Sequence, residues 1–273
     1  MTRPHMSPET VLSPLGCQLR DWNVSTRVPP RSGHRRGLIV DLDDTLYPHE
    51  AFVHSGLMAV ARHVEETSGV TAMDAFAVMT AARRERGGQE LQALCAHCGW
   101  PEDLVAELLA VYRGHLPNLH LPRASAEALT QLRRDRWRIV VLTNGLPLVQ
   151  RAKVRALGIG PLVDAVIYAE EHATGGKPAA AAFRAALNAL DLPASHCVCV
   201  GDDIVCDVAG AKAHGIRTIW FNAGAAWGNP GPADRHAESG PHTGAVAADL
   251  CIGSIGELPP LLAEWNMVNS DAA

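Results

Sequence analysis

Short apolar runs alternate with longer helix-like segments along the second half of the chain. Branched residues fill the short runs, as in Arg138-Ile-Val-Val-Leu142, and apolar residues recur every three to four positions between them. This alternation indicates βαβ units, whose parallel strands are buried on both faces by the connecting helices. We therefore expect an α/β fold, a Rossmann-like parallel sheet with helices on both faces. The expected strands are 37–41, 138–142, 165–168, 197–200, 217–220 and 250–252, and the expected helices are 124–134, 146–157, 178–190, 205–214 and 255–264.

A helix-rich stretch interrupts the alternation after the first expected strand. Four segments at 52–66, 72–86, 90–97 and 101–113 carry apolar residues at helical spacing, and glycines separate them. We expect an inserted α-helical cap at 52–116 and a Rossmann-like catalytic core at 36–51 and 117–273. Residues 1–35, which contain five prolines, are expected to be a disordered N-terminal arm, and 223–247 a long loop.

Four polar segments follow directly after expected strands or begin expected helices. In an open parallel sheet the carboxyl ends of the strands meet at one edge, so these segments could line a single pocket. They are Asp41-Leu-Asp43-Asp44-Thr45, Thr143-Asn144-Gly145, Gly175-Gly176-Lys177-Pro178 and Gly201-Asp202-Asp203-Ile-Val-Cys-Asp207.

The first two segments allow both a catalytic and a structural interpretation. Asp41 and Asp43 lie on the same side of an extended chain, where one carboxylate can attack and the other can transfer a proton. The alternative is a turn with helix-capping side chains. The Thr143 hydroxyl and the backbone of Asn144 and Gly145 could bind an anion at a helix start, or simply cap that helix.

The last two segments contribute charge. Lys177 could neutralise a phosphate, or could be a solvated lysine at a helix start. Asp202 and Asp207, grouped with Asp41, would form an oxygen-only site, which favours Mg²⁺ over zinc. Alternatively, Asp207 could interact only with the helix dipole.

Together and in this order, the four segments resemble the haloacid dehalogenase-like (HAD) hydrolase superfamily, in its branch with a helical cap. The resemblance runs from about Gly37 to the last helix. It implies that Asp41 attacks phosphorus, and that Asp43 protonates the leaving group, activates water and ligates Mg²⁺ through its backbone carbonyl. It further implies that Thr143, the Asn144 backbone and Lys177 bind phosphate, that Asp202 ligates Mg²⁺, and that Asp207 supports the metal or orients Lys177. Asp203 is a further acidic candidate, and whether Asp203 or Asp207 contacts the metal directly is left open.

The resemblance also narrows the reaction. Family members that act as dehalogenases typically lack the second aspartate, so Asp43 favours a phosphatase. The stretch from Asp41 to Pro48 resembles pyrimidine 5′-nucleotidases, and a small phosphate monoester, possibly a nucleoside monophosphate, is the expected substrate. The alternatives are a haloacid dehalogenase, a phosphomutase and a non-catalytic binding protein. His49, Arg83, Arg84 and Arg86 are candidate substrate contacts, with solvated surface as the alternative.

Composition restricts location and partners. We find no apolar run long enough to span a membrane and no apolar core of a secretory signal, so no membrane partner is expected. Seven cysteines scattered through the chain suit a reducing, cytoplasmic compartment, and the Cys95-Ala-His97-Cys98 group is interpreted as helix packing. The net charge of −5 argues against nucleic acid as a partner. We expect a monomer or homodimer.

Overall fold

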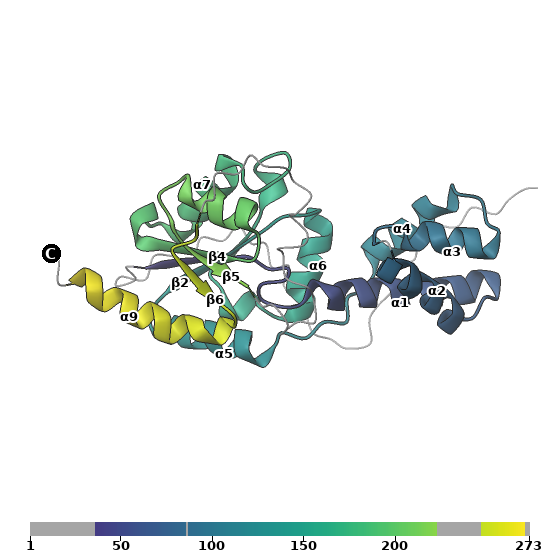
Figure 1. Ribbon diagram of the computed structural model, residues 1–273, viewed down its shortest axis with the longest axis horizontal. Helices are drawn as coiled ribbons and strands as arrows, with labels where there is room; N and C mark the ends of the chain where they lie inside the picture. The colour runs from purple at the N-terminus through teal and green to yellow at the C-terminus, as the bar shows by residue number, and fades with distance from the viewer. Residues whose placement is uncertain (1–35, 86, 223–246, 271–273) are drawn as a thin grey trace, which may run out of the picture.

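The structure is a computed structural model, and it describes residues 36–85, 87–222 and 247–270. The expected arm at 1–35 and nearly all of the expected loop at 223–247 lie outside the described residues. Figure 1 shows two parts side by side, a sheet covered by helices and a separate group of helices.

The sheet has six described strands, all parallel, in the order β3-β2-β1-β4-β5-β6. The first strand lies in the middle, and the chain continues to β2 on one side and later to β4 on the other. The expected α/β, Rossmann-like fold is confirmed. The strands are β1 (Gly37–Val40), β2 (Arg138–Thr143), β3 (Ala165–Tyr168), β4 (Cys197–Gly201), β5 (Arg217–Phe221) and β6 (Leu250–Ile252).

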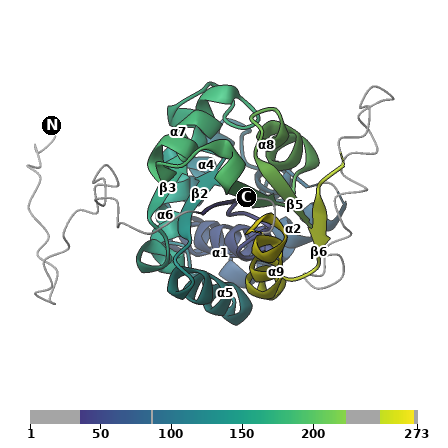
Figure 2. The ribbon, with the colours of Figure 1, turned by 90° about the vertical axis from the view of Figure 1, so that its left-hand side faces the viewer.

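Both faces of the sheet are buried, which explains why its strands read as continuous apolar runs. Along β1, Leu38 and Val40 belong to one hydrophobic cluster and Ile39 to the other. On the first face the sheet packs against α5 (Arg123–Arg134), α6 (Pro147–Leu157) and α9 (Leu258–Ser270). On the second it packs against α7 (Ala180–Leu190) and α8 (Gly210–Lys212), as Figure 2 shows in an end-on view.

The separate group consists of four helices inserted between β1 and β2. They are α1 (His49–Ser68), α2 (Ala72–Glu85), α3 (Glu90–Cys98) and α4 (Leu104–Gly114). These helices bury their own apolar cluster, which includes Val60, Met79 and Leu94. Gly56 lets α1 approach α4 closely, because a Cβ at this position would lie 2.4 Å from the Tyr112 ring. The insert therefore has a core distinct from those of the sheet.

The segment after β4 differs from the regular helix expected at 205–214. Residues Ile204–Ala209 form a π-helical turn, and only Gly210–Lys212 are α-helical. The Asp203 carboxylate accepts hydrogen bonds from Val205 N and Cys206 N, while Asp203 O accepts from Asp207 N and Val208 N. Asp203, to which the sequence assigned no role, thus caps this wide turn, a geometry that is frequent at functional sites.

Candidate active site

Two of the expected acidic residues lie at the carboxyl ends of neighbouring strands. Asp41 follows β1 directly, and its backbone N–H donates to Val200 O of β4 at 2.9 Å. Asp202 follows β4 directly. The strands that follow β1 in the chain lie first on one side of it (β2, β3) and then on the other (β4, β5, β6). The carboxyl ends of β1 and β4 therefore lie at the topological switch point, where open α/β sheets bind ligands.

Lys177 is buried between two carboxylates. Its Nζ donates to Asp41 Oδ1 at 2.5 Å and to Asp207 Oδ1 at 2.7 Å. Burial alone would lower the pKa of a lysine, but Asp207 and Asp41 raise the pKa of Lys177 well above its ordinary value. The ammonium group is therefore a fixed positive charge. The alternative of a solvated lysine is wrong, because only 5% of Lys177 is exposed.

A third carboxylate, that of Asp202, lies close to the two that bind Lys177. Oxygens of Asp41, Asp202 and Asp207 lie within 4.8 Å of one another. Burial, followed by repulsion from Asp207, raises the pKa of Asp202 to about 7, and burial also raises the pKa of Asp41. A buried, under-neutralised group of oxygen donors is chemistry that suits a hard divalent cation. These residues therefore fit a metal site.

The placement of Asp207 depends on a missing side chain at the end of β4. A Cβ on Gly201 would lie 2.2 Å from Asp207 Oδ2, so only glycine lets this carboxylate fold back over the strand. Asp203 N donates to the same oxygen at 3.1 Å. The carboxylate is thus held by the turn as well as by Lys177, which is more than an interaction with a helix dipole would provide.

Asp43 has a different environment from that of Asp41. Its carboxylate accepts from Lys153 Nζ at 2.9 Å through both oxygens, from Gln150 Nε2 at 2.8 Å and from Tyr47 OH at 2.5 Å. Burial alone would raise the pKa of Asp43, but Lys153, His49 and the Tyr47 hydroxyl together hold it below its ordinary value. The Asp43 side chain is not among the three carboxylates grouped at the metal site, and the role of its backbone carbonyl stays a prediction.

Thr143 and Asn144 make contacts that the sequence did not suggest. Gln150 Nε2 donates to Thr143 Oγ1 at 2.6 Å. Asn144 Oδ1 accepts from Lys177 N at 2.7 Å, and Asn144 Nδ2 donates to Lys177 O at 3.1 Å. The close fit requires Gly176, where a Cβ would lie 2.3 Å from Asn144 Oδ1. The Asn144 side chain therefore fixes the backbone of Lys177.

Two helix boundaries also differ from expectation. The helix after β2 begins at Pro147 without a side-chain cap, so Thr143 and Asn144 are not its N-cap. The helix after Lys177 begins at Ala180, beyond the cis Lys177–Pro178 peptide bond, so Lys177 lies in a loop rather than at a helix start. Thr143, Asn144 and Lys177 are therefore held by hydrogen bonds to residues of other segments and not by helix formation.

Gln150 and Lys153 were missed by the sequence analysis. They lie one turn apart on the buried face of α6, with exposures of 1% and 3%. A usable signal was present, because only three of the 24 lysine and arginine residues are lysines. Two of these three, Lys153 and Lys177, are buried against aspartates.

Of the candidate substrate contacts, Arg83 lies within the insert and His49 lies next to Asp43. Arg83 pairs with Glu50 at 2.6 Å and with Glu90 at 2.9 Å, which joins three helices of the insert. Arg84 is exposed, and Arg86 lies outside the described residues. His49 Nδ1 lies 3.8 Å from Asp43 Oδ1. Cys95 packs in the core of the insert, as expected.

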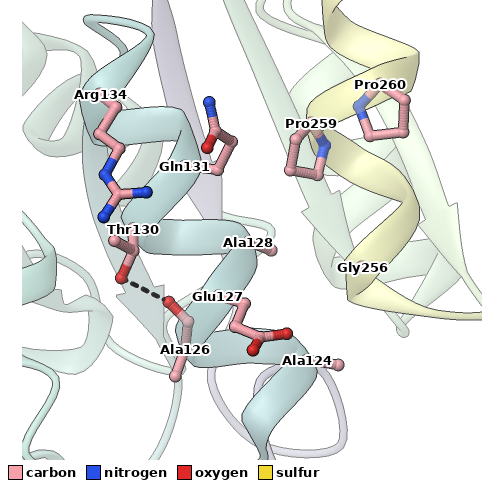
Figure 3. A pocket seen from close by; sticks show the side chains of 10 residues that line it. All are labelled: Ala124, Ala126, Glu127, Ala128, Thr130, Gln131, Arg134, Gly256, Pro259 and Pro260. Carbon is pink, nitrogen blue, oxygen red and sulfur yellow. Dashed lines mark hydrogen bonds between the residues drawn. The ribbon is translucent and has the colours of Figure 1, made fainter.

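A groove of about 660 Å³ lies elsewhere, between α5 and α9 (Figure 3). Its walls combine small and apolar side chains of both helices with a few polar ones, and none of the residues discussed above lines it. The lining residues are Ala124, Ala126, Glu127, Ala128, Thr130, Gln131, Arg134, Gly256, Pro259 and Pro260.

Residues 36–215 match the family model of the haloacid dehalogenase-like hydrolases. Ribulose-1,5-bisphosphate 5-phosphatase of Halopiger xanaduensis is 32% identical over 82% of this chain and 98% of its own length. Phosphoserine phosphatase of Thermus thermophilus is 34% identical over 64% of this chain and 67% of its own.

A solved structure of similar fold is a HAD hydrolase of Bacillus subtilis. It shares 19% identity, with a TM-score of 0.58, over 84% of this chain and 99% of its own. That structure is described as bound to magnesium and as revealing interdomain movement. In the described part of this chain, no helix is both long and apolar enough to cross a membrane.

The Asn144 side chain provides a test of how Lys177 is held. Replacement of Asn144 by alanine removes both hydrogen bonds to the Lys177 backbone, and we expect the free energy of unfolding to fall by about 1–3 kcal/mol. Asn188→Ala is the matched control, because Asn188 is an exposed residue in the body of α7. Urea unfolding followed by circular dichroism measures both variants, and equal midpoints would contradict this role of Asn144.

Proposed function

The chain belongs to the haloacid dehalogenase-like hydrolases and is a phosphoric monoester hydrolase, and we propose that Asp41 is its nucleophile. The observation that carries the proposal is the position of Lys177 Nζ, between Asp41 and Asp207 and next to the carboxylate group that includes Asp202. One carboxylate with a fixed cation beside it can receive a phosphoryl group, because the cation offsets repulsion by the phosphate dianion.

The reaction then has two steps. An Asp41 oxygen attacks phosphorus, the bond to the leaving oxygen breaks, and Asp43, which must carry a proton at this point, gives that proton to the leaving oxygen. Asp43 next removes a proton from water, whose oxygen attacks the aspartyl-phosphate, so that inorganic phosphate leaves and the Asp41 carboxylate is regenerated. Thr143 and the Asn144 backbone hold phosphate oxygens, and Lys177 neutralises their charge.

Mg²⁺ is the proposed cofactor, held by the carboxylates of Asp41, Asp202 and Asp207 and by the backbone carbonyl of Asp43. Bound there, it supplies a positive charge that polarises the phosphate. The oxygen-only donor set supports this choice over zinc. The magnesium bound to the Bacillus subtilis hydrolase gives additional support.

The proposed substrate is a small phosphate monoester. The names of the relatives specify ribulose-1,5-bisphosphate and phosphoserine, which share a phosphate monoester but have different leaving groups. A panel that contains both compounds, nucleoside monophosphates and sugar monophosphates therefore identifies the leaving group. The proposed location is a reducing cytoplasm, which the six free thiols of the described part support, and the proposed assembly is a monomer or homodimer.

Two alternative reactions remain open to the same fold. Halide release from a 2-haloacid without phosphate release would support a dehalogenase, and a requirement for a sugar-phosphate acceptor would support a phosphomutase. A purely binding protein would turn over none of the panel. The hydrogen-bonded Asp43 favours the phosphatase, because attack on a haloacid needs no acid to protonate an alkoxide.

We also propose that the insert at 52–116 is a cap over the site and that 36–51 and 117–273 form the catalytic core. The separate apolar core of the insert supports this division, and the proposed hinges are the connections 45–50, which ends in the first turn of α1, and 116–122. A part of this kind can move as a unit and exclude water when substrate is bound.

Removal of the nucleophile is the first prediction of the proposal. With p-nitrophenyl phosphate and Mg²⁺, we expect Asp41→Asn to lower kcat by at least about 10³-fold, because no covalent intermediate can form. Asp249→Asn is the control, since Asp249 pairs with Lys212 away from the site. Phosphate release measures the rate, and mass spectrometry of acid-quenched enzyme measures the aspartyl-phosphate. Wild-type turnover by Asp41→Asn would remove the proposed nucleophile.

Stabilisation by Mg²⁺ is expected to depend on pH. The pKa of Asp202 is raised to about 7, so its contribution to stability is present at low pH and is lost as the pH rises through about 7. A bound divalent cation reverses this loss, and saturating Mg²⁺ should add roughly 1–3 kcal/mol at about pH 8 but much less at about pH 5. Melting temperatures with Mg²⁺ and with EDTA measure the difference. The same shift in Asp202→Asn would contradict the site.

Closure of the cap predicts substrate-dependent protection. With Mg²⁺ and vanadate, a phosphate analogue, amide hydrogen exchange in the connections 45–50 and 116–122 should slow relative to Mg²⁺ alone, because closure restricts both. Exchange in β6, far along the sheet from the insert, is the internal control. Unchanged exchange in both connections while vanadate inhibits the enzyme would count against a moving cap.

A further inference from the structure

The Asp43 carboxylate is held from three directions. An ionised carboxylate offers about four acceptor positions, and here Lys153 takes one on each oxygen, Gln150 one on Oδ2 and Tyr47 one on Oδ1. Because rotation about the side-chain bonds would break these contacts together, they select one orientation. An acid or base must point at the proton that it transfers, so this orientation matters for any proton transfer by Asp43.

Lys153 and Gln150 belong to one rigid element. Both lie on the buried face of α6, and neither is exposed by more than 3%. Lys153 Nζ contacts both Asp43 oxygens and lies 4.4 Å from the centre of the Phe52 ring. With these neighbours the ammonium group faces Asp43 and an aromatic ring rather than the phosphate-binding segments, which argues against direct contact with substrate.

Gln150 connects two of the strand-end segments. The two protons of its amide nitrogen go to Asp43 Oδ2 at 2.8 Å and to Thr143 Oγ1 at 2.6 Å. Gly145, next to this amide, has a φ of +108°, a backbone conformation that favours glycine over residues with a side chain. A single side chain thereby sets the position of Asp43 relative to the segment after β2.

The start of α1 closes the other side of this cluster. His49 Nδ1 lies 3.8 Å from Asp43, and Phe52 packs edge-on against His49 as well as under Lys153. Figure 1 shows α6 beside the point where α1 leaves the sheet. The contacts of Lys153 therefore come from both the core and the insert.

We propose that Lys153 and Gln150 are positioning residues that hold the Asp43 carboxylate in the orientation required for proton transfer. The inference rests on the proposed function, in which Asp43 is the acid and base. Stability alone is a weak reason for this arrangement, because buried ion pairs are often replaceable by apolar residues without loss. In a chain with so few lysines, a lysine buried on a helix face and paired with an aspartate indicates a specific requirement for an ammonium group.

The test compares Lys153→Met and Gln150→Leu with two phosphate esters and Mg²⁺. Lys212→Met is the matched control, since it removes the lysine of a partly exposed Lys–Asp pair. For an alkyl phosphate, whose leaving group needs a proton, we expect kcat/KM to fall by about 10²-fold in both variants, because a misplaced acid donates poorly. For p-nitrophenyl phosphate, whose leaving group needs little protonation, the fall should be at least several-fold smaller. A purely structural role would lower both values equally, and that outcome would overturn the inference.

A double-mutant cycle tests the positioning role of Lys153 separately from the proposed role of Asp43 as acid and base. If Lys153 acts through Asp43, then Lys153→Met should cause no further loss of kcat/KM in an Asp43→Asn background. Additive losses would overturn the positioning role. Wild-type values in Asp43→Asn for both esters would instead refute the proposed role of Asp43 itself. Impaired Asp43→Asn, with Lys153→Met and Gln150→Leu equal to the Lys212→Met control, would refute only the positioning.

Folding of the variants does not decide the outcome. Lys153→Met leaves the partly buried Asp43 without its cation, so that variant is the one with the greatest risk of misfolding. The double variant Asp43→Asn/Lys153→Met carries neither charge, and Gln150→Leu keeps the ion pair, so each gives a reading even if Lys153→Met alone does not fold. Circular dichroism identifies folded variants before kinetics are measured.

Discussion

The ion pairs of Lys177 with Asp41 and Asp207 are the interaction on which the rest of the site depends. Both carboxylates and the ammonium group are nearly inaccessible to water, and removing charges from water costs more than an ion pair usually returns. Several features of the fold exist to permit this arrangement. Asn144 fixes the Lys177 backbone, Gly176 makes room for Asn144, and Gly201 makes room for Asp207. In the proposed reaction Lys177 neutralises charge where the phosphoryl group is transferred, and this role explains the arrangement better than stability does.

Much of the fold could be predicted because its strands are buried on both faces. Continuous apolar runs such as those of β1 and β4 indicate strands that are buried on both faces, whereas strands with one exposed face alternate apolar and polar residues. The helices between the strands showed apolar residues every three to four positions. The π-helical turn at Ile204–Ala209 could not be predicted. This turn depends on hydrogen bonds that Asp203 accepts through both its side chain and its carbonyl oxygen. Such contacts leave no periodic pattern in the sequence.

The proximity of the candidate residues could be predicted best where position along a strand carried the information. Asp41 and Asp202 follow strand ends, and the topology alone brings neighbouring strand ends together. Gln150 and Lys153 lie inside a helix, where a pattern-based reading assigns buried positions to apolar residues and polar ones to solvent. The amide contacts of Asn144 were equally inaccessible, because they join residues 33 positions apart in a loop. The scarcity of lysine was the one compositional clue to Lys153.

Two aspartates separated by one residue have opposite electrostatic surroundings, and this contrast explains how they could divide the chemistry. Asp41 belongs to a group of three carboxylates with one ammonium, where burial raises its pKa and a divalent cation completes the charge balance. Asp43 has its own ammonium group and two further donors, and its pKa is held low without any metal. A divalent cation beside Asp41 would favour its ionised form, which is the form that attacks, and the low pKa of Asp43 favours the ionised form that removes a proton from water. In the proposed reaction the metal therefore serves the nucleophile, while α6 holds the residue that acts as acid and base.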